Sequence, residues 1–281
     1  PVAHHSNSHD SVSRRDYIPL IARIIDFVAV QANMTESNAS NQAVVFGDIH
    51  GNITALEAVF NDMSDQGLGD DRYCLGDLVG YGTSPNEVVE FVRSRSIPTI
   101  MGNYDRGVGN NSDDCGCAYQ TETEQRRGEK SIRWTNEQIT DENREYLRTL
   151  DERIEFELGD LDVVLVHGSP RRINEYLYED RPDSSFERLL DSVEADVLVC
   201  GHTHLPYQKT LPSGRHVVNA GSVGKPKDED PRACYLVLTA DGNTLDVQFP
   251  RVEYDVEREA QSIENAEMPS AFAEMLRTGT S

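Results

Sequence analysis

Positive charge is scarce in this chain of 281 residues. Asp and Glu number 49 against 26 Lys and Arg, so the formal net charge at pH 7 is −23. Only four of the cations are lysines: Lys130, Lys209, Lys225 and Lys227. Binding to nucleic acid or to an anionic membrane depends on clustered cations that neutralise phosphates, and this sequence has no basic stripe. The composition therefore argues against duplex nucleic acid and membranes as partners.

The acidic excess also bears on the source of the protein. Many acids combined with few lysines are typical of halophilic archaea, in which solvated carboxylates keep proteins soluble in molar salt. We therefore expect a halophilic archaeal protein. An ordinary acidic cytoplasmic protein is the alternative.

Long apolar runs and paired cysteines are missing as well. No stretch reaches the roughly 18 apolar residues of a membrane span, and the nearest, 17–34, is broken by Pro19, Arg23 and Asp26. The five cysteines are an odd number with no secretory signal ahead of them, so we expect free thiols in a reducing cytoplasm. Leu, Ile, Val and Phe still make up 66 residues, above the roughly one-fifth that a globular core requires.

The first 33 residues differ from the rest, because their charges balance and the whole −23 falls on residues 34–281. We predict an N-terminal extension over residues 1–42 and one domain over residues 43–281. The extension is consistent with a polar arm and an amphipathic helix; alternatively, translation starts at Met34 and the leader is a gene-model artefact. A cluster of His4, His5 and His9 could bind a metal, but a polar terminus is the simpler expectation.

From residue 43 onward the apolar periodicity alternates between strand and helix, as in an α/β domain. It predicts strands over 43–46, 73–75, 97–100, 154–158, 162–166, 196–200, 206–211, 215–219, 233–239 and 244–250. It predicts helices after Asn52, from Pro85, and over 136–149, 184–193 and 256–278. The polar stretch 103–130 shows neither pattern, so we expect an active-site loop or partial disorder there.

Polar motifs follow the ends of five predicted strands. They are Gly47-Asp-Ile-His50, Gly76-Asp77, Gly102-Asn-Tyr-Asp105, Val166-His167 and Gly201-His-Thr-His204. Ligands of open α/β sheets collect outside the carboxyl ends of the strands. Asp, Asn and His supply the oxygen and imidazole atoms that suit manganese, iron or zinc, and seven such residues are too many for one ion. The sequence therefore predicts a site for two metal ions.

Together and in this order, the five motifs resemble the signature of the calcineurin-like metallophosphoesterases: D-x-H, G-D, G-N-x-D, a lone His and G-H-x-H. The resemblance continues through Asn219–Gly224, and the C-terminal tail is similar to the small prokaryotic phosphodiesterase-like branch. It implies an α/β fold built as a four-layer α/β/β/α sandwich. It also implies a ligand set in which Asp77 bridges two metals, the first held by Asp48, His50 and His204, the second by Asn103, His167 and His202.

The activity that this resemblance implies is hydrolysis of a small phosphoester. Two divalent ions, Mn²⁺ in the first place and Fe, Zn or Ni as alternatives, would activate a bridging hydroxide for in-line attack on phosphorus. Asp77, Asn103 and His167 would then serve catalysis as well as metal binding. A phosphodiester is the expected substrate and a phosphomonoester is less so. A phosphoprotein (Ser/Thr) phosphatase and a non-catalytic scaffold are the alternatives, and a homo-oligomer is left open.

Tyr104 departs from the family pattern, because many members have a histidine there that is assigned to the leaving group. Tyrosine, with an ordinary pKa near 10, is the poorer proton donor, so we expect the best activity on good leaving groups. Asp105 would orient Tyr104 or serve as a turn residue.

Other residues near the motifs are weaker candidates. Cys115 and Cys117 could chelate a metal or form a redox switch, although simple thiols are the expectation. Ser222 lies in a glycine-rich loop that the family places beside the site, and a structural turn explains it equally well. Five arginines could bind the far end of a substrate phosphate, although surface ion pairs are the expectation for most: Arg106, Arg126, Arg127, Arg171 and Arg172.

Overall fold

The computed structural model describes residues 1–2 and 41–281. The predicted N-terminal helix and the histidine cluster lie outside the described residues. Within the described part, no helix is both long and apolar enough to cross a membrane.

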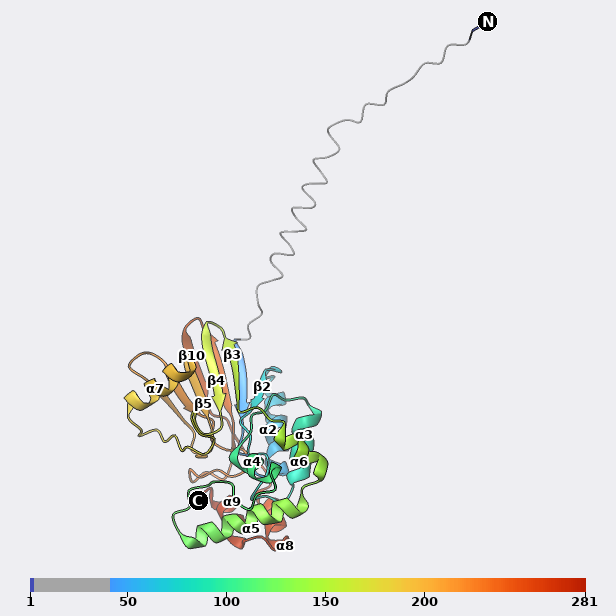
Figure 1. The fold of residues 1–281 in the computed structure, drawn as a ribbon, viewed down its shortest axis with the longest axis vertical. Coiled ribbons are helices and arrows are strands. Elements are labelled where there is room, and N and C mark those ends of the chain that lie inside the picture. Colours follow the sequence, from blue (N-terminus) through green and yellow to red (C-terminus); the bar gives the residue numbers. More distant parts are fainter. Residues whose placement is uncertain (3–40) are drawn as a thin grey trace. The chain divides into compact units, whose positions relative to one another are not determined.

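Two β-sheets form the centre of the domain (Figure 1). The first has the order β10-β9-β1-β2, in which β1 is parallel to β2 and antiparallel to β9. Its strands are β1 (Gln42–Phe46), β2 (Arg72–Cys74), β9 (Leu236–Asp241) and β10 (Thr244–Gln248). A short separate pair joins β8 (Ala233–Cys234) to β11 (Arg251–Val252).

The second sheet has the order β3-β4-β5-β7-β6. Strands β4, β5 and β7 run parallel, whereas the two edge strands are antiparallel to their neighbours. Its members are β3 (Arg153–Leu158), β4 (Leu161–Val166), β5 (Val197–Cys200), β6 (Tyr207–Thr210) and β7 (His216–Asn219). Tight turns at 212–214 and 241–243 join β6 to β7 and β9 to β10, as their Gly-containing sequences predict.

Alternation along the strands builds the layers. In β1, Ala43 and Val45 pack against the second sheet, whereas Val44 and Phe46 face the helices on the other side. In β4, Val163 and Leu165 join the core between the sheets, and the intervening valines face α7 (Asp183–Val193). Helix, sheet, sheet and helix therefore stack in four layers, which confirms the predicted α/β/β/α sandwich.

The helices over the first sheet are α2 (Ile53–Asp65) and α3 (Pro85–Ser94). Asn52 caps α2 by accepting a hydrogen bond from the backbone of Ala55, and Pro85 occupies the first turn of α3. The predicted helix over 256–278 is two helices, α8 (Val256–Asn265) and α9 (Ser270–Thr278), which contact each other and are separated just before Ser270 by Pro269.

The prediction of an irregular loop over 103–130 was wrong. The segment forms α4 (Asn103–Gly109) and the start of α5 (Glu122–Gln138), and only 110–121 lacks a regular element. Helix α5 buries Gly128, Ser131, Ile132 and Thr135, a stripe that is mostly small and polar, so apolar periodicity could not reveal it.

Two further boundaries differ from the prediction. The predicted helix over 136–149 is the end of α5 followed by α6 (Asp141–Arg148), because Thr140 caps a new helix through the backbone of Asn143. The predicted strand over 97–100 is reduced to isolated bridges at Thr99 and Ile100.

Candidate functional site

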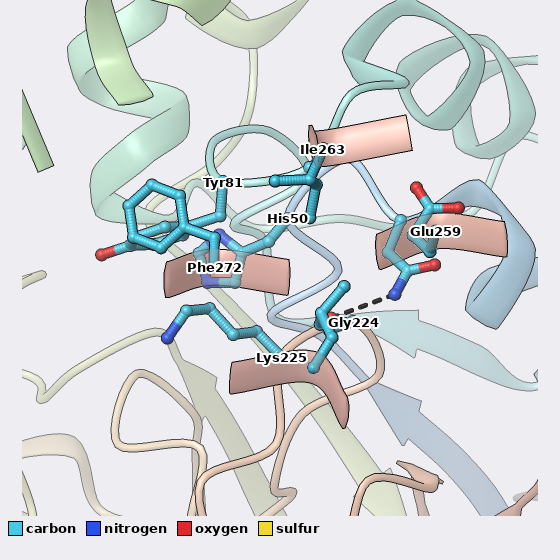
Figure 2. Close-up of a pocket in the computed structure, with 10 residues that line it drawn as sticks. His50, Tyr81, Gly224, Lys225, Glu259, Ile263 and Phe272 are labelled. Carbon is cyan, nitrogen blue, oxygen red and sulfur yellow. Dashed lines mark hydrogen bonds between the residues drawn. The ribbon is translucent and has the colours of Figure 1, made fainter. Parts of the chain in front are cut away.

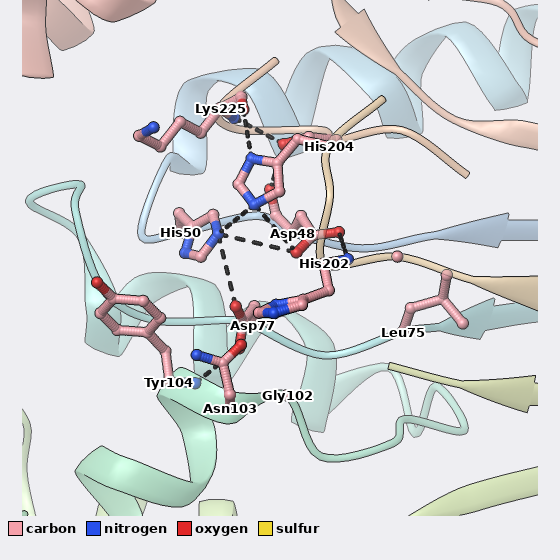
Figure 3. A network of polar contacts seen from close by, with 12 residues as sticks. Asp48, His50, Leu75, Asp77, Gly102, Asn103, Tyr104, His202, His204 and Lys225 are labelled. Atoms are coloured by element: carbon pink, nitrogen blue, oxygen red, sulfur yellow. Dashed lines mark hydrogen bonds and ion pairs between the residues drawn. The ribbon is translucent and has the colours of Figure 1, made fainter. Parts of the chain in front are cut away.

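The five motifs meet at one edge of the sandwich, beyond the carboxyl ends of β1, β2, β4 and β5 and at the start of α4. Figure 3 shows their carboxylates and ring nitrogens pointing toward one another. All seven predicted metal-ligand residues are buried there: Asp48, His50, Asp77, Asn103, His167, His202 and His204. Their side chains form two neighbouring groups, and Asp77 lies between them.

The first group is formed by Asp48, His50 and His204. Its ligand atoms lie within 4.8 Å of one another. The Oδ1 atom of Asp48 is 3.4 Å from Nε2 of His204 and 3.8 Å from Nε2 of His50, and the two ring nitrogens are 3.2 Å apart. One carboxylate oxygen and two imidazole nitrogens thus surround one point.

The second group is formed by Asp77, His167 and His202, again within 4.8 Å. Oδ2 of Asp77 is 3.5 Å from Nε2 of His167 and also 3.6 Å from Nε2 of His50. Oδ1 of Asn103 is 3.0 Å from Nε2 of His167 and so belongs here too. Because Asp77 faces both groups, its position fits the bridging role that the resemblance implies.

Backbone carbonyls orient three of the histidines. The Nδ1 atoms of His50, His167 and His204 lie 3.1, 2.9 and 2.6 Å from the carbonyl oxygens of Val79, Leu75 and Lys225. An Nδ1–H that donates to a carbonyl leaves the lone pair on Nε2, directed at the shared centre. This is the arrangement of metal-binding imidazoles.

Two buried polar atoms indicate that a cation belongs in the centre. Oδ1 of Asp48 and Nε2 of His202 have no hydrogen-bond partner within the described residues. An unpaired buried carboxylate oxygen is costly, and a divalent cation satisfies both an oxygen and an imidazole lone pair. The donor set of oxygens and imidazoles therefore fits two divalent ions.

The ionisation of the site supports the same conclusion. Burial lowers the pKa of His50 and His202 to about 3 and that of His204 well below its ordinary value, so these rings are neutral, the form that binds a cation. Burial raises the pKa of Asp48 to about 7, a shift that a bound dication would reverse. Burial opposes the charged forms of Asp77 and His167 as well, but their mutual attraction prevails, lowering the pKa of Asp77 and raising that of His167 to about 9.

The backbone at the centre is held in an uncommon conformation. Five of the seven ligand residues have positive φ, between 49° and 66°: Asp48, His50, Asp77, His202 and His204. Left-handed backbone costs a residue with a Cβ roughly 1–2 kcal/mol. Neighbouring segments also approach closely at the centre, since a Cβ at Gly102 would lie 2.1 Å from Oδ1 of Asp77.

The carboxylate of Asp105 hydrogen-bonds to backbone groups and not to the Tyr104 side chain. Its two carboxylate oxygens accept hydrogen bonds of 2.9 Å from the N–H groups of Leu78 and Gly102. These groups flank Asp77 and Asn103, so Asp105 ties together the two loops that carry them. The structure thus favours a positioning role over the orientation of Tyr104.

Tyr104 lies beside the centre with its ring edge-on to His50 at 5.4 Å, and its backbone N–H donates to Oδ1 of Asp77 at 2.8 Å. Its hydroxyl is buried without a hydrogen-bond partner in the described part of the chain. The ring lines a cavity of about 550 Å³ whose floor includes His50, Asp77 and His202.

Asn103 connects the centre to the two nearby cysteines. Its Nδ2 donates to the carbonyl of Cys115 at 3.0 Å and to Sγ of Cys117 at 3.3 Å, which aims Oδ1 at His167. The two sulfur atoms are 3.0 Å apart and both thiols are free. All five cysteines are free in the structure, as the sequence predicts.

The other candidates are more dispersed. Of the five arginines, only Arg127 lines the cavity above the centre; Arg106, Arg171 and Arg172 line a separate cavity, and Arg126 pairs with Glu122. Ser222 donates from Oγ to the carbonyl of Asp48 at 2.7 Å, so it supports the ligand loop from behind.

Sequence reasoning missed much of the cavity wall, including Lys225, Lys227, Tyr176 and Tyr178. The rarity of lysine was the available signal for the first two, because both follow the Gly221–Gly224 loop. No periodicity marks the tyrosines, which lie in an irregular segment between β4 and α7.

Comparison with known proteins identifies the family. Residues 42–243 match the model of the calcineurin-like phosphoesterase superfamily domain. An uncharacterized protein of Methanocaldococcus jannaschii is 33% identical over 252 residues, which cover 84% of this chain and 97% of that protein.

Two crystal structures extend the comparison. A metallophosphoesterase from Sphaerobacter thermophilus is 30% identical with a TM-score of 0.67. A hypothetical protein from Pyrococcus horikoshii is 26% identical with a TM-score of 0.73. Each alignment covers 85% of this chain and 99% of the other. With its four-layer fold and paired clusters of acids and histidines, the chain belongs to the calcineurin-like phosphoesterase superfamily.

Proposed function

We propose that this protein is a phosphodiesterase that depends on two divalent metal ions. Mn²⁺ is the preferred ion and Fe, Zn or Ni are the alternatives, and phosphomonoesters are hydrolysed more slowly than phosphodiesters. The observation that carries the proposal is the position of Asp77, whose Oδ2 lies within 3.6 Å of a histidine from each cluster. Bound there, the two ions would supply a nucleophilic hydroxide at neutral pH and neutralise the phosphoryl oxygens.

The chain's own residues would prepare the site for this reaction. One ion would be held by Asp48, His50 and His204. The other would be held by Asn103, His167 and His202, and Asp77 would face both ions. The carbonyl bonds to Nδ1 keep the neutral rings of His50 and His204 in the ligating tautomer. The ring of His167, whose pKa is raised by Asp77 despite burial, would release its Nε2 proton on metal binding. A substrate bound in the cavity above the seven residues would be oriented so that the nucleophile attacks the phosphorus in line with the leaving group.

The test of the function is hydrolysis of bis-p-nitrophenyl phosphate by metal-free protein to which Mn²⁺ is returned, with bound metal counted by elemental analysis. Two metals per chain and metal-dependent turnover are expected. Faster turnover of a phosphoserine peptide than of the diester would favour a protein phosphatase, and absence of both metal and turnover would favour a non-catalytic scaffold.

The acidic composition adds a condition for that assay. We propose that the charge of −23 is a salt adaptation of a cytoplasmic halophilic protein, a proposal that rests on the composition alone. The diester should then be hydrolysed as well in 2 M KCl as in 0.1 M KCl. Loss of activity and unfolding in 2 M KCl would contradict the adaptation.

Mn²⁺ is expected to stabilise the fold. A ligand that binds only the native state contributes about 2.7 kcal/mol at a hundred times its Kd. A domain of this size gains about 2–4 °C in Tm per kcal/mol, so Tm should rise by about 5–10 °C in a thermal melt. The control is a His202→Ala/His204→Ala variant, in which the rise should largely vanish; an equal rise would place the Mn²⁺ elsewhere.

Tyr104→Phe is expected to change how strongly kcat depends on the leaving group, without lowering Tm. We propose that the Tyr104 hydroxyl donates a hydrogen bond toward the leaving group, an interaction that alkyl esters need more than aryl esters. Loss of a neutral hydrogen bond corresponds to roughly a 2- to 10-fold decrease in kcat for alkyl diesters. Tm should not fall, because the hydroxyl has no hydrogen-bond partner among residues 41–281. Equal effects on aryl and alkyl substrates would assign the ring to packing.

A further inference from the structure

Half of the lysines in this chain line one cavity. Lys225 and Lys227 both contribute to the wall of the 550 Å³ cavity above the two clusters. Figure 2 shows the Lys225 side chain extending past Phe272 and Tyr81, and its Nζ is 4.7 Å from the centre of the Tyr81 ring. Lys225 is only 5% exposed, so this ammonium group has been largely withdrawn from bulk water.

In a protein with 49 acidic residues, no ion pair or side-chain hydrogen bond of Lys225 or Lys227 occurs in the described part of the chain. Lys209, by contrast, pairs with Asp183 at 3.0 Å. An ammonium group that is withdrawn from water without an anionic partner is poorly solvated. An anionic group between them would offset that cost.

Much of the rest of the cavity wall is aromatic. Five of the eleven tyrosines line the cavity: Tyr81, Tyr104, Tyr119, Tyr176 and Tyr178. The ring centre of Tyr176 lies 4.1 Å from that of His202. The ring of Tyr178 stacks nearly parallel to the ring of Tyr176, with a centre-to-centre distance of 5.9 Å and an interplanar angle of 8°. Tyr178 is 47% exposed, which leaves its ring free to stack with a planar group.

We propose that Lys225 and Lys227 bind a second phosphate of the substrate, and that the tyrosine wall receives a nucleobase. The substrate class is then a nucleotide phosphodiester that carries a further phosphate group. This inference rests on the proposed function, since the first phosphate is assigned to the two clusters. Arg127 adds a third cation to the wall and Glu124 is the acid among the lining residues outside the two clusters, so the cavity favours anions in an acidic protein.

A matched pair of substrates tests the proposal. The p-nitrophenyl ester of thymidine 5′-phosphate has one phosphorus, and its 3′-phosphorylated derivative differs only by the second phosphate. With the full chain and Mn²⁺, we expect kcat/KM to be roughly 10- to 100-fold higher for the derivative, the range expected for a charge-assisted contact. Thymidine 3′,5′-bisphosphate should likewise inhibit at least about tenfold more tightly than thymidine 5′-phosphate.

Variants then assign the preference to the lysines. Lys225→Gln/Lys227→Gln should bring the ratio of the two kcat/KM values close to one, mainly through KM, and the corresponding Arg variant should restore it. Lys130→Gln makes the same change on the exposed surface of α5 and should keep the wild-type ratio. Tyr178→Ala should raise KM for both esters without changing their ratio.

Two negative results would mean different things. Metal-dependent hydrolysis of both esters with a wild-type ratio near one, or a Gln variant that loses activity on both equally, would overturn the second phosphate site alone. Absence of metal-dependent hydrolysis of either ester would overturn the proposed function, and this inference with it.

Discussion

Asp77→Asn is expected to lower kcat/KM for bis-p-nitrophenyl phosphate by at least about 100-fold. Even residues that only support metal ligands cost roughly 10- to 100-fold when changed, and Asp77 faces both clusters directly. The amide can still accept the backbone N–H of Tyr104 with its oxygen, as Oδ1 of Asp77 does. Its NH₂ group would then replace Oδ2 beside His50 and His167, where a donor cannot bind a cation.

Metal content separates this result from unfolding. The variant should keep a cooperative melt but retain fewer than two metal ions per chain in elemental analysis. Asp162→Asn, the same change at an exposed position of β4, should leave activity and metal content unaltered. Full occupancy by two metals together with near-wild-type turnover would contradict a bridging role for Asp77.

Asp105→Ala is expected to be the most destabilising of the substitutions considered. It leaves two buried N–H groups, of Leu78 and Gly102, without their charged acceptor. At roughly 1.5–3 kcal/mol for each hydrogen bond to a charged group, the loss should be about 3–6 kcal/mol, toward the lower end because burial and the nearby charge of Asp77 already disfavour the charged carboxylate. Tm should fall by roughly 10 °C or more.

Chemical denaturation measures this loss as a free energy of unfolding. The control is Asp114→Ala, which removes an exposed carboxylate that also accepts a backbone N–H, from Gly116, and should cost less than about 1 kcal/mol. If Asp105→Ala melted like the control while activity fell, the carboxylate would act in the reaction and not in fixing the two loops.

The layered core and the seven clustered residues were predictable because both leave local signals. Short apolar runs at 43–46 and 162–166 predicted buried strands, and short polar motifs at the strand ends indicated which side chains would meet. Which strand residues face each layer emerged only from the packing, because these runs are apolar throughout. The sequence did not predict the start of helix α5, because its buried face includes Gly128 and Ser131, small residues that give no apolar periodicity. The cavity wall could not be predicted either, because residues such as Tyr176 and Lys225 are far apart in the sequence and come together only through tertiary packing.

The left-handed backbone at five ligand residues has a consequence for how this protein can change. Glycine would adopt those φ angles at no steric cost, so a sequence optimised for folding alone would place glycine there. Under the proposed function these five side chains are kept for metal binding, so activity and heat resistance favour different residues at the same five positions. Thermostable descendants of this chain would therefore have to gain their stability elsewhere, most readily on the charged surface.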